Sequence, residues 1–347
     1  MNRELTAALA ALLVAGLAGI ALAQPQAEKV TPALIEAARK EGTVVFYSSA
    51  DIVVGERVGK AFEAAYPGVK VKVERNGSER LFQKFQQELA ARIAIADVIS
   101  TSDAAHFVIW KRDGVLAPYL PEEAAAQIPT EYRDKDAAYL PWRLSLSVMG
   151  YNTKLVKPED APKSLVDLLD PKWSGKIVKA HPSYSGTILT ATFQITRELG
   201  WDYYEKLAKQ KVMQVQSSTE PPKKLSLGER AIMAEGNEYT ALLAKSQGNP
   251  IEVIYPREGS PTIVSPSAVV KNAPHPNAAR LFQSFLYARE SQQALVDEMF
   301  MRSFHRGVKE PAGRPSLAHV KAMKEDAEAV VEQVETIKER YRRHFGT

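Results

Sequence analysis

The feature that most constrains this chain is a regular alternation, from residue 43 onward, of short strand-like runs and amphipathic helical segments. The run 43–47 is β-branched and aromatic and predicts a buried strand, and 97–100 predicts another short strand. The run 69–73 alternates Val with Lys and predicts a half-buried strand. Between these runs, apolar side chains recur at helical spacing over 54–66 and 81–89. This strand–helix–strand–helix–strand order predicts an α/β fold, with a mainly parallel sheet flanked by helices on both faces.

A small polar loop follows each of the three predicted strands. The three loops are Ser48-Ser49-Ala50-Asp51, Asn76-Gly77-Ser78 and Thr101-Ser102-Asp103. In an open α/β sheet the carboxyl ends of the strands lie at one edge, and ligands bind there. We therefore expect the three loops to converge on a single binding site.

A fourth polar loop, Ser183-Tyr184-Ser185-Gly186-Thr187, precedes a helix predicted over 188–199. Hydroxyl groups together with free N–H groups at the start of a helix favour an anion. The loop that ends at Ser78 has the same character. The alternative for both loops is ordinary N-capping, which requires no ligand.

The first residues have the pattern of a secretory signal peptide. Arg3 precedes a small and apolar run over 5–20, and Ala21-Leu22-Ala23 supplies a cleavage pattern. We expect cleavage after Ala23 and export of the remaining chain. A retained membrane anchor is the alternative, although the run is short beside the roughly 20 apolar residues of a membrane-spanning helix.

Composition excludes several classes of protein. The chain has no Cys, which rules out disulfides, Cys-ligated zinc, iron–sulfur clusters and a Cys nucleophile. Its 45 Lys and Arg against 41 Asp and Glu leave a net charge of +4, too small an excess to suggest a nucleic-acid partner.

Recognisable catalytic motifs are also missing from the sequence. The six His residues do not have zinc-protease spacing, and neither a Gly-rich phosphate loop nor a serine-hydrolase elbow occurs. This favours binding over catalysis, so we expect no enzyme. An exported hydrolase with a carboxylate such as Asp103 as general base remains the alternative. The adjacent Tyr203-Tyr204 suits ferric iron chemically, but its helical context predicts packing in the core.

Six stretches of the chain resemble solute-binding proteins of ABC importers, in the branch that includes the ferric-iron-binding proteins. They are 44–51, 96–103, 150–156, 168–177, 228–239 and 271–286. The resemblance implies a periplasmic monomer of the two-lobed type II periplasmic-binding fold, which closes on a small-molecule solute and delivers it to an inner-membrane ABC permease with its ATPase. It implies these boundaries: signal peptide 1–23, first lobe 24–143 plus 272–347, second lobe 152–261, and hinge strands 144–151 and 262–271.

The iron ligands of that branch are only partly matched here. They are a His after the first strand, a Glu after the third and two adjacent Tyr in the second lobe. These positions fall on or near Asp51, on Ser102 with Asp103 beside it, and on the pair Glu238-Tyr239. We therefore expect no metal and no cofactor. The alternative is Fe3+ as the transported ligand, with oxygen ligands from Asp51, Asp103, Glu238 and Tyr239.

The expected solute is a small organic anion, which is a carboxylate, a phosphonate or a phosphorylated compound. Hydroxyl and N–H donors would bind its acidic group, and carboxylates would bind its hydroxyl or amino groups. The predicted ligand-binding residues are Ser48, Ser49, Asp51, Gly77, Ser78, Ser102, Asp103, Tyr184, Ser185, Gly186, Thr187, Glu238 and Tyr239.

Overall fold

The computed structural model describes residues 25–311 and 314–346. The predicted signal peptide, residues 1–23, lies outside the described residues. The alternation of strands and helices that the sequence predicts is confirmed. In chain order the first elements are α1 (Pro32–Glu41), β1 (Thr43–Ser48), α2 (Ile52–Ala65), β2 (Lys70–Arg75), α3 (Ser78–Ala90), β3 (Val98–Ser100), α4 (Ala104–Arg112), β4 (Leu116–Ala117), α5 (Glu122–Gln127) and β5 (Leu140–Asn152).

The second part of the chain repeats the mixed α/β pattern. Its elements are β6 (Ile177–Ala180), α6 (Gly186–Leu199), α7 (Trp201–Ala208), β7 (Met213–Val215), α8 (Glu220–Ser226), β8 (Ile232–Asn237), α9 (Glu238–Ser246), β9 (Ile251–Ile254), β10 (Ser260–Val270), α10 (Pro276–Tyr287), α11 (Arg289–Met299), β11 (Ala322–Met323) and α12 (Ala327–Phe345). Short 3-10 turns are η1 (Thr130–Tyr132), η2 (Pro158–Asp160), η3 (Val166–Leu169), η4 (Pro171–Trp173) and η5 (Leu317–His319).

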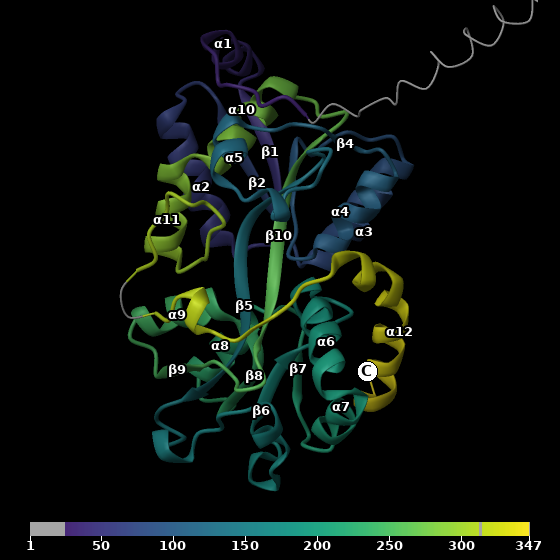
Figure 1. The fold of residues 1–347 in the computed structure, drawn as a ribbon, viewed down its shortest axis with the longest axis vertical. Coiled ribbons are helices and arrows are strands. Elements are labelled where there is room, and N and C mark those ends of the chain that lie inside the picture. Colours follow the sequence, from purple (N-terminus) through teal and green to yellow (C-terminus); the bar gives the residue numbers. More distant parts are fainter. Residues whose placement is uncertain (1–24, 312–313, 347) are drawn as a thin grey trace, which may run out of the picture.

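The strands form one long sheet whose order is β2-β1-β3-β10-β5-β8-β6-β7. The strand β1 pairs in parallel with β2 and β3, and β6 pairs in parallel with β7 and β8. We call the half around β1–β3 lobe 1 and the half around β6–β8 lobe 2. Figure 1 shows both halves, joined by the long strands β5 and β10 along the long axis of the molecule. The mixed α/β, two-lobed fold predicted from the sequence is confirmed.

The strands β5 and β10 connect the lobes, and the chain between α11 and α12 passes from one lobe to the other as well. The first half of β5 pairs antiparallel with β10, and its second half pairs with β8 and β9 of lobe 2. The segments expected to be hinges, 144–151 and 262–271, lie largely within these two strands. The predicted hinge segments thus lie in strands that both lobes share.

Each lobe has its own hydrophobic core. In lobe 1, Phe46, Phe62 and Phe282 pack with Trp142 from β5. In lobe 2, Tyr203 and Tyr204 are buried, and the Tyr204 hydroxyl donates to Glu235, which agrees with a packing role. The helix α12, which the prediction places in the first lobe with the rest of 272–347, packs against α4 of lobe 1 and against α6 and α7 of lobe 2. Within the described residues, no helix is both long and apolar enough to cross a membrane.

Candidate functional site

The loops that the sequence predicts to converge meet where the two lobes touch. The Gly186 N–H at the start of α6 donates to the Ser78 hydroxyl at the start of α3, at 2.6 Å. Ser185, the N-cap residue of α6, makes no capping bond with its own side chain. Lobe 1 therefore supplies a side-chain cap for a helix of lobe 2.

Gly186 is also a point of close approach between the lobes. A Cβ atom at Gly186 would lie 2.5 Å from the Asp103 Cβ and 3.0 Å from the Ser78 Oγ. A Cβ atom at Gly77 would lie 3.3 Å from the Tyr184 carbonyl oxygen. The predicted residues Gly77, Ser78, Asp103, Tyr184 and Gly186 thus lie together at one seam. The absence of side chains at the two glycines allows the backbones to approach.

A second contact between the lobes involves Asp51 and Tyr239. The Asp51 N–H donates to the Tyr239 hydroxyl at 3.1 Å, and the Asp51 side chain caps α2. Nearby, the Arg75 guanidinium donates to the Ala50 carbonyl and to the Ser217 hydroxyl of lobe 2, both at 3.2 Å. Asp51 and Tyr239, which the sequence selected separately, are therefore neighbours.

Some of the other predicted hydroxyl groups have a hydrogen-bond partner within the protein, and one has none. The Ser49 hydroxyl accepts from the Ser102 N–H at 2.8 Å, and the Ser48 hydroxyl accepts from the Ala50 N–H at 3.2 Å. The Ser49–Ser102 bond holds the loop after β1 against the loop after β3, whereas the Ser48–Ala50 bond lies within the loop after β1. The Thr187 hydroxyl, in contrast, is fully buried and has no hydrogen-bond partner. Its hydrogen-bonding capacity is therefore unused by the protein.

The sequence interpretation missed Arg143, which lies on β5. Its side chain is buried, and its Nε and Nη2 atoms have no hydrogen-bond partner. Burial lowers the pKa of the Arg143 guanidinium, an effect that Tyr239 opposes and Arg75 reinforces, so both side chains lie close to it. An arginine nevertheless stays protonated in proteins. The result is a permanent, buried positive charge with an open hydrogen-bonding edge.

Hydroxyl groups without partners surround Arg143 on the crossing strands. Ser145 and Ser147 lie on the same face of β5 as Arg143, and Ser265 lies opposite Arg143 on β10. All three hydroxyls are buried without a hydrogen-bond partner. Native proteins seldom leave such groups unpaired unless a ligand or water completes them. The alternation of polar and apolar residues over 143–147 is the sequence signal that would have identified this face.

Glu238 is expected to bind the ligand, but in this structure its carboxylate is already engaged by other side chains. Its carboxylate is held by Arg302, which donates from Nε at 2.8 Å and from Nη2 at 2.7 Å. It also accepts from the Tyr255 hydroxyl at 2.5 Å, and the ion pair is fully buried. Both oxygens are thus engaged within the protein. A partner 64 positions away in sequence could not be inferred from the sequence around Glu238.

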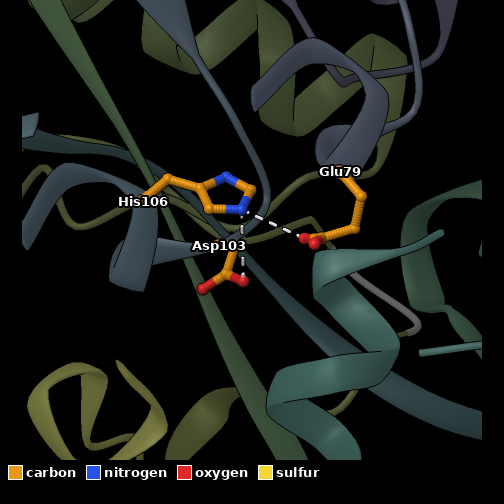
Figure 2. Close-up of side chains that lie close together, drawn as sticks. All are labelled: Glu79, Asp103 and His106. Carbon is orange, nitrogen blue, oxygen red and sulfur yellow. Dashed lines mark hydrogen bonds and ion pairs between the residues drawn. The ribbon is translucent and has the colours of Figure 1, made fainter. Parts of the chain in front are cut away.

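Asp103 belongs to a buried charged cluster with Glu79 and His106 (Figure 2). The His106 Nε2 lies 3.0 Å from Glu79 Oε1 and 3.7 Å from Asp103 Oδ2, and Lys338 of α12 donates to Glu79 Oε2 at 2.8 Å. Burial alone would raise the pKa of Glu79, but His106 and Lys338 outweigh it and lower that pKa to about 2. Burial is the main cause that raises the pKa of Asp103 to about 6.

This cluster differs from the ligand set implied for iron. Among the described residues, Glu79, Asp103 and His106 are the one group of three His, Asp or Glu side chains close enough to share an ion. Asp51 and Glu238 are outside it. The carboxylates of Asp51, Asp103 and Glu238 are therefore not gathered in this structure.

Comparison with known proteins identifies the family. Residues 94–324 match the model of the bacterial extracellular solute-binding protein family. The chain belongs to that family. Its members are substrate-binding components of ABC transporters, which work with a membrane permease and an ATPase. This solute-binding protein is therefore of the periplasmic, ABC-transporter type, as its sequence predicts.

Individual relatives of the solute-binding protein differ in what they bind. Iron uptake protein A1 of Synechocystis is 24% identical over 68% of this chain and 69% of its own length. The structure of the periplasmic binding protein AfuA from Actinobacillus pleuropneumoniae, with fructose-6-phosphate bound, superposes with a TM-score of 0.81 at 24% identity, over 88% of this chain and 99% of AfuA. Iron-bound HitA from Pseudomonas aeruginosa gives 0.74 at 25% identity, over 87% and 99%.

Proposed function

We propose that this solute-binding protein captures a small organic anion between its lobes and delivers it to an inner-membrane permease with its ATPase. The anion carries a carboxylate, phosphonate or phosphate group, and it is bound and released without chemical change. In this proposal the first lobe consists of 24–143 and 272–347, and the second lobe consists of 152–261. The two lobes rotate about the hinge strands 144–151 and 262–271.

The observation that carries this proposal is the open edge of Arg143. The Nε and Nη2 atoms of a guanidinium lie side by side and match the two oxygens of a carboxylate or phosphate. Arg302 uses these same two atoms to hold Glu238 in this protein. At Arg143 the same two nitrogen atoms are buried without a hydrogen-bond acceptor. The two oxygens of a bound carboxylate or phosphate would supply the acceptors.

The surroundings of Arg143 favour an anion as well. Arg75 adds a second positive charge close by, and the hydroxyls of Ser145, Ser147 and Ser265 offer donors on the same face. The hydroxyl of Thr187 at the start of α6 is also without a partner. The structure of the similar protein AfuA has fructose-6-phosphate bound. The guanidinium groups of Arg143, which is buried, and Arg75, which is half-buried, disfavour Fe3+ beside them, because a metal ion and a guanidinium repel each other.

The protein's own cargo provides the direct test. Native mass spectrometry of protein purified from its periplasm without refolding should release an organic anion. Isothermal titration calorimetry with phosphate monoesters, phosphonates and carboxylates should then find a ligand whose affinity falls in Arg143→Lys, which keeps the charge but loses the paired edge. The matched control is Arg57→Lys, an exposed arginine paired with Glu298. An iron adduct with a visible phenolate charge-transfer band, and no affinity for any anion, would overturn the proposal.

A further inference from the structure

The cluster of Glu79, Asp103 and His106 is separate from Arg143 and has features that the charge network alone does not explain. All three side chains are at least nine-tenths buried, and one possible ligand atom of each lies within 4.8 Å of the others. Figure 2 shows the Glu79 and Asp103 carboxylates lying on the side of the His106 ring that carries Nε2. A nitrogen and two carboxylate oxygens thus face a common point.

The protonation of His106 follows from the partners of its two ring nitrogens. The Thr101 hydroxyl donates its hydrogen to the Asp103 carbonyl oxygen at 3.1 Å. The same hydroxyl lies 3.1 Å from His106 Nδ1 and must therefore accept from an Nδ1–H group. His106 Nε2 lies 3.0 Å from the Glu79 carboxylate, which can only accept, so Nε2 also carries a proton in this structure. Burial alone would lower the pKa of His106, but the charges of Asp103 and Glu79 outweigh it and raise that pKa. A metal ion would bind at Nε2 in place of that proton, because the Nδ1–H group keeps its own partner. Hydrogen bonds of this kind orient metal-binding histidines in proteins.

Asp103 provides an independent observation. Its Oδ1 atom accepts from the Ala105 N–H at 2.9 Å and caps α4. Its Oδ2 atom is buried, has no hydrogen-bond partner and faces His106 Nε2 at 3.7 Å. A buried carboxylate oxygen without a partner is costly, and a cation would remove that cost. The protonated His106 Nε2 faces this atom at a distance too long for a hydrogen bond, and a metal ion in place of that proton would bind the oxygen directly.

We propose that Glu79, Asp103 and His106 form a binding site for a divalent transition-metal ion, with zinc as the best match. One imidazole nitrogen and two carboxylate oxygens suit zinc, and three protein ligands leave a position for water or another oxygen. The site is distinct from the iron set implied by the family resemblance, because Glu79 and His106 are not part of that set. It also does not depend on Arg143 or on the nature of the solute.

Lys338 gives the proposal a specific consequence. Its ammonium group holds the second oxygen of Glu79 and places a positive charge next to the site. A metal ion therefore competes with the contact between α12 and α3. Removal of this charge should strengthen metal binding, whereas a purely structural ion-pair network would gain no affinity for metal from the same change.

The test uses the full mature chain, stripped with a chelator and kept free of added anions. Calorimetry with Zn2+ alone should show one ion per chain, and Co2+ should give visible absorption bands in wild-type protein. His106→Gln should weaken Zn2+ binding at least tenfold, and Lys338→Met should tighten it severalfold. The control is His275→Gln, because His275 pairs with Asp97 at 2.8 Å but has no third ligand, and this variant should bind as wild type does.

Three results would overturn the metal site. They are wild-type protein that takes up no Zn2+, equal weakening in the His106 and His275 variants, and weaker binding in Lys338→Met. The Co2+ spectrum of wild-type protein decides the question even where His106→Gln fails to fold. Arg143→Met should keep full Zn2+ affinity, so a failure of the metal site and a failure of the anion proposal remain distinguishable.

Discussion

Replacement of Arg143 by Met should make the ligand-free protein more stable while it weakens anion binding. The two unpaired donors of Arg143 each carry a desolvation cost of about 1–3 kcal/mol. The guanidinium recovers part of this by lying 5.5 Å from the Trp142 ring, a contact worth about 0.5–2 kcal/mol. At the midpoints of these ranges the net gain on removal is about 3 kcal/mol, or an increase of roughly 4–5 °C in Tm for a chain of this size.

The same substitution should have the opposite effect on the bound state. Loss of one partner of a buried, hydrogen-bonded charge pair costs about 2–5 kcal/mol. At about 1.4 kcal/mol for each tenfold change, the affinity for the anion should fall by roughly thirtyfold to several thousandfold. Differential scanning calorimetry in an anion-poor buffer and isothermal titration calorimetry measure the two effects separately.

Arg302→Met is the matched comparison. This arginine is buried like Arg143, but its paired edge is filled by Glu238. Its removal leaves a buried carboxylate without its partner and should destabilise the protein by about 3–5 kcal/mol. The reasoning fails if Arg143→Met lowers the Tm as Arg302→Met does, or if Arg143→Met leaves the affinity for the cargo unchanged.

Three further changes test the seam and the electrostatics. Gly186→Ala would place a Cβ atom 2.5 Å from the Asp103 Cβ, so the lobes should close less fully. We expect at least tenfold weaker anion binding, and a larger radius of gyration by X-ray scattering with the anion bound. An unchanged affinity together with an unchanged radius would contradict the contact. Tyr239→Phe removes the acceptor of the Asp51 N–H, a loss of about 1 kcal/mol that should weaken anion binding roughly fivefold by calorimetry. Burial, with Lys179 and Arg342, lowers the pKa of His181 to about 4. Because the unfolded chain takes up this proton near pH 6.5, stability should fall as the pH drops from about 6.5 to 4, and urea denaturation of His181→Asn should show a shallower fall.

The sequence was sufficient to predict the fold because its signals are local and repeated. Runs of period 2 and of helical period identify β1–β3 and the helices between them without long-range information. The rule that strand ends share an edge then places the loops at Ser49, Ser78 and Asp103 close together. Ser49 does bond the loop of Ser102, and Ser78 does reach Gly186.

The roles of single charged residues could not be predicted in the same way. Arg143 and Arg302 are both arginines in stretches with many apolar residues, but one has a free edge and the other holds Glu238. The difference depends on a contact across 64 positions of the chain. The family resemblance places Glu238 at the position of an iron ligand, whereas its ion pair with Arg302 depends on the folded chain.

The contacts between the lobes also limit what the solute contributes to closure. The Gly186–Ser78, Asp51–Tyr239, Arg75–Ser217 and Arg80–Gln216 hydrogen bonds all join the lobes through protein atoms alone. A ligand shifts a conformational equilibrium only by its difference in affinity for the two states. These bonds give hydrogen-bond partners to groups at the helix starts. They leave the Nε and Nη2 atoms of Arg143 and the hydroxyl of Thr187 without hydrogen-bond partners. The selectivity of capture should therefore reside at those atoms. The Gly186 N–H and Ser78 hydroxyl, which already bond each other, should chiefly set how readily the lobes close.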